Sequence, residues 1–295
     1  MPSFALDLWT GLSLLGKFGI YLGFSGTLGG LFCLRLARSS IPPGLELLIS
    51  RYLLIVACAG LGGTVLHFLA QVGAVAGQGL VGMFDRNLIG IFASGNTGAA
   101  LYTRMSGFLL IGLIATCDML WQPNPLLRLL KWVGILLTGS SFLVVGHSID
   151  LGLWGSAALA LHLVAVALWT GSLFPLWYLA RHFDGQQIAP VMRDFGRMAL
   201  GFVAVLVLAG GYLAVQLLSS WSQLLNSAWG VTLLLKLTLV VALLGLAAMN
   251  KLLLTPALQR GESGDRLRRS IGLEIWLAAP ILLVTAFLSS AVGPN

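Results

Sequence analysis

Long apolar runs separated by short polar stretches dominate the chain. A helix needs about 20 apolar residues to cross roughly 30 Å of hydrocarbon. Runs of that kind cover residues 12–36, 46–74, 97–118, 130–146, 154–180, 195–218, 229–254 and 270–291. Because the runs are continuous rather than alternately apolar and polar, they favour α-helices over the strands of a membrane barrel. We therefore predict an all-α bundle of eight transmembrane helices that forms one integral domain over residues 1–295.

The connection 75–96 does not fit this simple pattern. Its first part is rich in glycine, and the apolar run Leu88–Phe92 is too short to span a bilayer. The pattern is compatible with a re-entrant segment or with a segment lying in the membrane interface, and the sequence leaves both alternatives open.

The composition supports a polytopic membrane protein. Of 295 residues, 58% are hydrophobic and 9% are charged, and the mean hydropathy is +0.94, whereas soluble domains carry about 25% charged residues. The net charge of +7 does not indicate nucleic-acid binding, because the basic residues lie at the ends of the apolar runs. The N-terminus lacks a basic region and a small-residue cleavage site, so we expect the first span to direct its own insertion.

The distribution of Lys and Arg predicts the orientation. The odd-numbered connections and their flanks hold 13 of the 17 basic residues: Arg35, Arg38, Arg51, Arg128, Lys131, Arg181, Arg193, Arg197, Lys251, Arg260, Arg266, Arg268 and Arg269. Cytoplasmic loops are enriched in Lys and Arg. We therefore expect the odd connections to be cytoplasmic and both termini to be periplasmic.

Several residue types are better explained by packing than by chemistry. Cys33, Cys58 and Cys117 lie in apolar runs at unrelated spacings, which is typical of buried structural cysteines rather than a disulfide framework. Glycines at 60, 62, 63, 210 and 211 would let helices approach closely. No Walker loop, dinucleotide fingerprint or HExxH motif occurs, and Ser140-Ser141 has no companion base in its helix. We predict that the chain is not an enzyme.

Three of the four histidines fall toward the predicted periplasmic side. His67 lies near the outer end of the second helix, His147 ends the fourth, and His162 lies about two turns into the fifth, while His182 is in a cytoplasmic connection. A structural, hydrogen-bonded histidine is the ordinary interpretation of each one. Three at one depth favour a ligand cluster, because ionisable side chains within spans are rare and functional.

The residues around these histidines limit the type of metal. Imidazole ligands suit copper, zinc, iron and nickel. Asp150 and Asp85 are the nearby outer acids apart from Asp7, which are too few for a calcium or magnesium site. Met83 and Met105 are possible secondary ligands that would favour Cu(I), although methionines in apolar segments usually belong to the core. Spacing alone does not separate a metal ion from haem.

Three further charges lie within predicted spans. Arg104 and Lys236 lie toward the outer side, and Glu274 lies toward the inner side. A charge within a span costs about 2.5–3.5 kcal/mol on insertion scales, so each is a candidate for a pathway or for charge pairing. Arg104 and Lys236 could instead extend toward the interface, or pair with Asp85 or Asp150. For Glu274 we expect a basic partner such as Arg268 or Lys251.

An ordered series of residues runs over four predicted helices in the second half of the chain: Gly146-His147, Leu161-His162-Leu163, Trp169-Thr170-Gly171-Ser172-Leu173, Arg193, Phe195-Gly196-Arg197, Gly210-Gly211-Tyr212, Trp229-Gly230, Lys236, Asn250-Lys251, Pro256, Leu267-Arg268-Arg269-Ser270 and Glu274. On this series, residues 146–293 resemble the copper resistance D (CopD/PcoD) family of bacterial inner-membrane proteins. The first half shares only its several spans and a histidine in the second helix.

The resemblance implies eight helices and copper transport across the inner membrane, which we expect to be uptake from the periplasm. It carries His147 and His162 over as copper ligands, with His67 as the third. It also implies a small periplasmic copper-binding protein as partner, here expected to be a separate protein because about eleven residues precede the first span. Two alternatives stay open: a b-type cytochrome in which two histidines bind haem, and a non-transporting membrane partner of a periplasmic copper protein.

Overall fold

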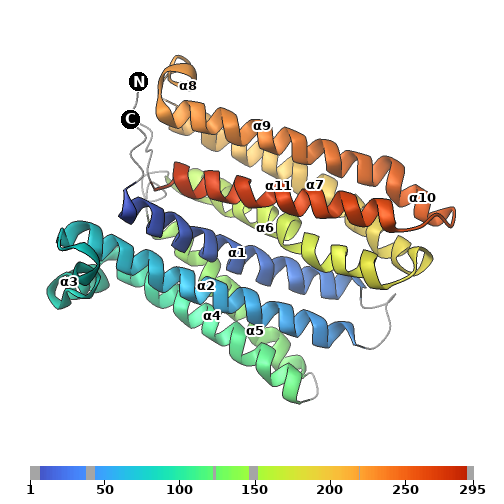
Figure 1. Ribbon diagram of the computed structural model, residues 1–295, viewed down its shortest axis with the longest axis horizontal. Coiled ribbons are helices and arrows are strands. Elements are labelled where there is room, and N and C mark those ends of the chain that lie inside the picture. Colours follow the sequence, from blue (N-terminus) through green and yellow to red (C-terminus); the bar gives the residue numbers. More distant parts are fainter. Residues whose placement is uncertain (1–6, 38–43, 122–123, 146–151, 219, 291–295) are drawn as a thin grey trace.

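The computed structural model describes residues 7–37, 44–121, 124–145, 152–218 and 220–290 (Figure 1). Across these ranges it contains eight helices that are long and apolar enough to cross a membrane. Their cores are α1 (Leu8–Ala37), α2 (Leu45–Ala76), α4 (Asn96–Leu120), α5 (Pro125–Ser140), α6 (Gly152–His182), α7 (Gly185–Leu217), α9 (Ala228–Met249) and α11 (Asp265–Leu288). The prediction of an all-α bundle with eight spans is confirmed.

Several helices begin before the apolar runs that predicted them. α7 begins at Gly185 rather than near residue 195, because the Asp184 carboxylate accepts a hydrogen bond of 2.9 Å from the Gln186 backbone N–H. α5 likewise begins at Pro125, where the Asn124 side chain accepts a hydrogen bond from Leu126 N–H. Polar capping residues set the start of a helix, whereas hydropathy reports only the part that can lie in lipid.

The 75–96 connection forms a 3₁₀ segment, η1 (Gly79–Phe84), and a short helix, α3 (Arg86–Ser94). The Asp85 side chain caps α3 by accepting hydrogen bonds from Asn87 and Leu88 N–H. α3 lies at one end of the bundle with none of its residues buried, and its contact with α2 includes an edge-on packing of Phe92 against Phe68 (Figure 1). This arrangement favours the interfacial alternative over the re-entrant one.

The helix α1 joins the two halves of the bundle. It packs against α2 on one side and against α6 and α11 on the other, so it lies between α2, α4 and α5 and the group of α6, α7, α9 and α11 (Figure 1). The N-terminal end of α1 and the C-terminal end of α11 lie at the same end of the bundle as α3 and α8 (Gln223–Asn226), opposite α10 (Thr255–Gln259). We call the end with α3 and α8 the outer end, following the charge-based prediction.

Glycines allow the closest helix contacts. A Cβ atom added at Gly171 of α6 would lie 1.7 Å from the Ser25 carbonyl oxygen of α1. At the same crossing, the Ser172 hydroxyl donates a 3.1 Å hydrogen bond to the Gly29 carbonyl. The packing role predicted for the glycines is confirmed at 60, 63 and 210, but it is wrong for Gly62 and Gly211, where an added Cβ would meet nothing within 4 Å.

Candidate functional site

His67 lies buried in the outer half of α2, between two polar side chains. Its Nε2 atom is 2.7 Å from the Gln71 amide nitrogen, and its Nδ1 atom is 2.9 Å from the Ser13 hydroxyl of α1. The amide nitrogen can only donate, so Nε2 accepts and Nδ1 carries the proton that is donated to Ser13. The imidazole is therefore oriented at both nitrogens and held by side chains from two helices.

Both partners of His67 also line a hollow of about 180 Å³ at the outer end. The lining residues are Asp7, Trp9, Thr10, Ser13, Ala70, Gln71, Ala74 and Ser290. At its rim, hydrogen bonds from the Thr10 hydroxyl and backbone N–H lower the pKa of Asp7 below its ordinary value. The hollow thus carries an ionised carboxylate at its rim and leads to the two side chains that hold His67.

Two cations lie close enough to His67 to interact with it electrostatically. Lys17 donates hydrogen bonds to the carbonyl and the hydroxyl of Ser289 on the C-terminal side of α11, at 2.6 and 3.1 Å. Arg104 of α4 donates through Nε to the Ser141 hydroxyl at 2.9 Å, and its guanidinium lies 5.2 Å from the Phe142 ring centre. The suggested pairing of Arg104 with Asp85 is not formed, because Asp85 caps α3 instead.

His162 lies in α6 and faces α7. The Nδ1 atom is buried and has no hydrogen-bond partner within the described ranges. A Cβ atom added at Gly210 would lie 3.1 Å from both Nδ1 and Cε1 of His162. The absence of a side chain on this glycine therefore makes room for the imidazole ring. The backbone of Leu206 and the charge of Lys236 on α9 also interact with this imidazole. His162 thus has a buried ring nitrogen without a described hydrogen-bond partner inside the C-terminal half.

The two described outer histidines have different surroundings. His67 is held between α1 and α2, whereas His162 is turned toward α7. Over the ranges that the structure describes, no three His, Cys, Asp or Glu side chains are grouped so that they could hold a metal ion. His147 and Asp150 lie outside the described residues. His182 is exposed, and its Nδ1 lies 3.0 Å from the Tyr178 carbonyl oxygen.

The two methionines named as secondary ligands differ in their surroundings. Met83 is buried in η1, and its Cγ atom lies beside Gly73 of α2, where the Trp9 ring also packs. Met105 is partly buried in α4, next to Arg104. The position of Met83 corresponds to the ordinary packing interpretation.

Glu274 of α11 is buried, with 3% of its surface exposed, and its partner is an amide rather than a base. The Asn250 side-chain nitrogen donates a 2.5 Å hydrogen bond to Oε1 of Glu274. Arg268 instead pairs with Asp265 at 3.3 Å, and the Lys251 side chain lies beside Gly196 of α7. The expected basic partner of Glu274 is therefore replaced by a neutral one. Asn250 is uncharged, so the pattern of charged residues within the spans did not indicate it.

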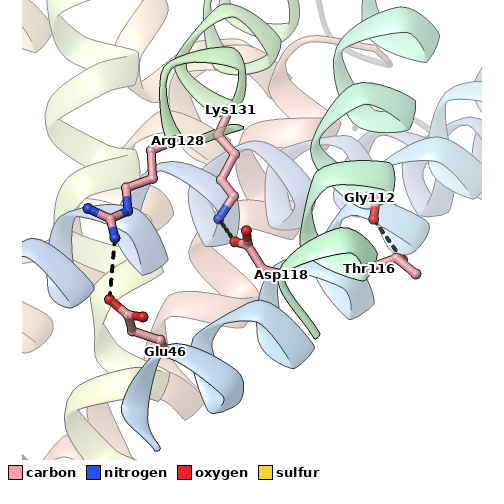
Figure 2. Close-up of polar contacts among 6 residues, drawn as sticks. All are labelled: Glu46, Gly112, Thr116, Asp118, Arg128 and Lys131. Atoms are coloured by element: carbon pink, nitrogen blue, oxygen red, sulfur yellow. Dashed lines mark hydrogen bonds and ion pairs between the residues drawn. The ribbon is translucent and has the colours of Figure 1, made fainter. Parts of the chain in front are cut away.

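A buried ion pair that the sequence pattern did not indicate lies at the opposite end of the N-terminal half. Lys131 of α5 pairs with Asp118 of α4, and their side chains are only 2% and 6% exposed (Figure 2). The neighbouring pair of Arg128 and Glu46 spans 3.9 Å and is much more exposed. The distribution of basic residues uses Lys131 only to predict orientation, although Asp118, at the end of the preceding span, indicates a partner for it.

Two comparisons with known proteins found a match. Residues 189–288 match the family described as copper resistance protein D (CopD). The inner membrane protein YebZ of Escherichia coli K12 is 28% identical over 207 residues, which cover 66% of this chain and 67% of the relative. No solved structure matches the chain. These findings support an association with copper, and they give the haem alternative no support.

Proposed function

We propose that this chain moves copper ions across the bacterial inner membrane, inward from the periplasm, because residues 189–288 match the family described as copper resistance protein D. The eight spans and the inner-membrane relative support this location. We propose His67 and His162 as copper ligands at two successive positions in the outer half. We propose His147, which lies between the predicted fourth and fifth spans, as a third ligand. A small periplasmic copper-binding protein would deliver the ion.

The observation that carries this proposal is the unused Nδ1 atom of His162. A buried polar atom without a partner is uncommon, and each case calls for an explanation such as a ligand that completes it. Imidazole nitrogen is a good ligand for copper. Neutral imidazoles are also required, because a protonated ring has no lone pair to offer.

The outer hollow gives the ion a first position. The ionised carboxylate of Asp7 at the rim attracts a cation from the periplasmic side. Nε2 of His67 then becomes available when the Gln71 amide turns away, while Ser13 continues to orient the ring through Nδ1. The hydrogen bond between Nδ1 and Ser13 thus positions the ring while Nε2 binds the ion.

Changing His67 or His162 to Ala should lower copper accumulation by about tenfold or more in a strain that depends on this protein, because each change removes a ligand. The measurement is cellular copper at equal protein abundance. His182→Ala is the matched control, since that ring is exposed at the other end of α6 and should leave accumulation unchanged. Unchanged copper in both ligand variants would contradict the proposal.

Gly210 provides a second prediction that leaves every proposed ligand in place. Gly210→Leu adds a side chain where a Cβ alone would lie 3.1 Å from the His162 ring, so the ring must move and copper uptake should fall by about tenfold. Gly211→Leu is the control, because that position faces open space. Equal uptake by the two variants would show that the place of the His162 ring does not matter.

A further inference from the structure

A second polar cluster lies in the half of the bundle opposite the outer end. Glu274 and Ser270 are four residues apart on α11, so they lie on one face of that helix. Asn250 reaches this face from the end of α9 through its hydrogen bond to Glu274. All three side chains are at least nine-tenths buried, although none of them belongs to the proposed copper ligands.

Two oxygen atoms in this cluster have no partner among the described residues. They are Oδ1 of Asn250 and the Ser270 hydroxyl oxygen. The amide nitrogen of Asn250 already bonds to Glu274, so the free Oδ1 belongs to a side chain that is directed into the cluster. Buried polar atoms are nearly always paired, so the unpaired amide oxygen and the unpaired hydroxyl call for a missing partner.

The backbone is also irregular at this point. Asn250 opens a π-helical segment, η4 (Asn250–Leu254), that interrupts the regular helix between α9 and α10. Single π-helical turns within α-helices occur frequently at functional sites. Here the wider turn presents the Asn250 side chain to α11, so the irregular backbone and the polar cluster belong to the same feature.

No basic side chain of the neighbouring described elements compensates the charge of Glu274. α11 packs against α9, α6, α1 and η4. The basic groups of those elements either have other contacts or are exposed: Lys236 and His162 interact with each other, Arg181 stacks on Trp177, His182 contacts Tyr178, Lys17 contacts Ser289, Lys251 lies beside Gly196, and Arg35 is exposed. On α11 itself, Arg268 pairs with Asp265, and Arg266 and Arg269 are exposed. A buried carboxylate is therefore left with a neutral amide as its only described partner.

We propose that Glu274, Asn250 and Ser270 form a binding site for a small hard monovalent cation, either Na⁺ or a proton. The site offers a carboxylate, an amide oxygen and a hydroxyl, which are the oxygen ligands that hard cations prefer. It offers no sulfur or imidazole, so it differs chemically from the proposed copper ligands. A bound cation would supply the positive charge that the described residues lack.

This site would allow a cation gradient to drive the proposed copper transport. This extension rests on the proposed function. The chain has no nucleotide-binding motif in its sequence, and a cation gradient is a driving force that such a site can use. Intramembrane carboxylates commonly mark ion pathways and proton relays. We infer that binding of the cation at Glu274 accompanies each copper ion that crosses.

Thermal unfolding of the purified full chain tests the site without any copper. A cation that binds only the folded protein raises its Tm in a saturable way. NaCl replacing choline chloride should raise the Tm of the wild type, and Glu274→Gln should abolish the shift. If the cation is a proton, Na⁺ has no effect, and the Tm difference between wild type and Glu274→Gln changes with pH in choline chloride. Glu262→Gln, at an exposed carboxylate paired with Arg260, is the control.

A second pair of variants keeps the test decisive if Glu274→Gln does not fold. Ser270→Ala removes one neutral oxygen and should weaken the dependence of Tm on the cation without abolishing it. Asn250→Asp adds a second carboxylate and should make the Tm respond to Ca²⁺, whereas we expect no response of the wild type. A Tm difference from wild type that is constant across the Na⁺, Ca²⁺ and pH series, in every variant, would overturn the site.

Copper uptake into vesicles then tests the coupling separately. A gradient of the identified cation should accelerate copper uptake by the wild type severalfold and have no effect on Glu274→Gln. If the wild type binds the cation but moves no copper, the cation site stands and the proposed function fails. If copper moves equally with and without the gradient, the coupling is wrong.

Discussion

Replacing Lys131 with Met should lower the free energy of unfolding by about 3–5 kcal/mol, because it leaves the Asp118 carboxylate charged and buried without its partner. Oδ1 of Asp118 already lacks a hydrogen bond among the described residues, so Lys131 is the main group that compensates this carboxylate. Reversible unfolding in mixed micelles, followed by helical circular dichroism, measures the change.

The double variant Asp118→Leu/Lys131→Met should recover most of that loss. Replacing both members of a buried ion pair by apolar residues is often neutral or stabilising, since neither charge then has to be removed from water. Arg128→Met is the control, because the Arg128–Glu46 pair is exposed and is worth about 0–1 kcal/mol (Figure 2). Equal losses in Lys131→Met and Arg128→Met would show that burial of the pair has no energetic consequence.

Gly171→Ala should be equally severe, with a loss of about 3–5 kcal/mol, although it adds a single methyl group. That methyl would lie 1.7 Å from the carbonyl oxygen of Ser25, so α1 and α6 must move apart. The separation would also lengthen the hydrogen bond between Ser172 and Gly29. Overpacking usually costs 1–3 kcal/mol, and a clash with backbone rather than a flexible side chain places this change above that range.

Gly62→Ala provides the matched control for this prediction. Ala favours a helix over Gly by about 1 kcal/mol, and an added Cβ at position 62 meets nothing within 4 Å. We therefore expect this variant to be as stable as the wild type or slightly more stable. The opposite signs of the two Gly→Ala changes separate steric contact from helix propensity, and a destabilised Gly62→Ala would contradict the helix packing described here.

Hydropathy was sufficient to predict the eight spans, because about 20 apolar residues in lipid have few alternatives to a helix. It did not predict where α5 and α7 begin, since those positions depend on the side chains of Asn124 and Asp184. It also did not predict the π-helical turn at Asn250, because an apolar run looks the same whether its backbone is regular or not.

The candidate site, like the fold, could be predicted only in part from the sequence. Sequence position placed His67 and His162 toward the same side, but it contained no information about the direction in which each ring points. In the structure, Gly16 and Ser13 of α1 lie beside His67, whereas Gly210 of α7 lies beside His162. Contacts between residues far apart in the chain decide these neighbours, so the two separate surroundings and the neutral partner of Glu274 became visible only in the fold.

The most direct test of the central claim is copper flux into vesicles that contain only the purified full chain and lipid. Wild type and His182→Ala should take up copper at equal rates, while His67→Ala and His162→Ala should be at least about tenfold slower at equal incorporation. Uptake that is absent in the wild type, or that is the same in all four proteins, would contradict the account that this chain moves copper through the two imidazoles.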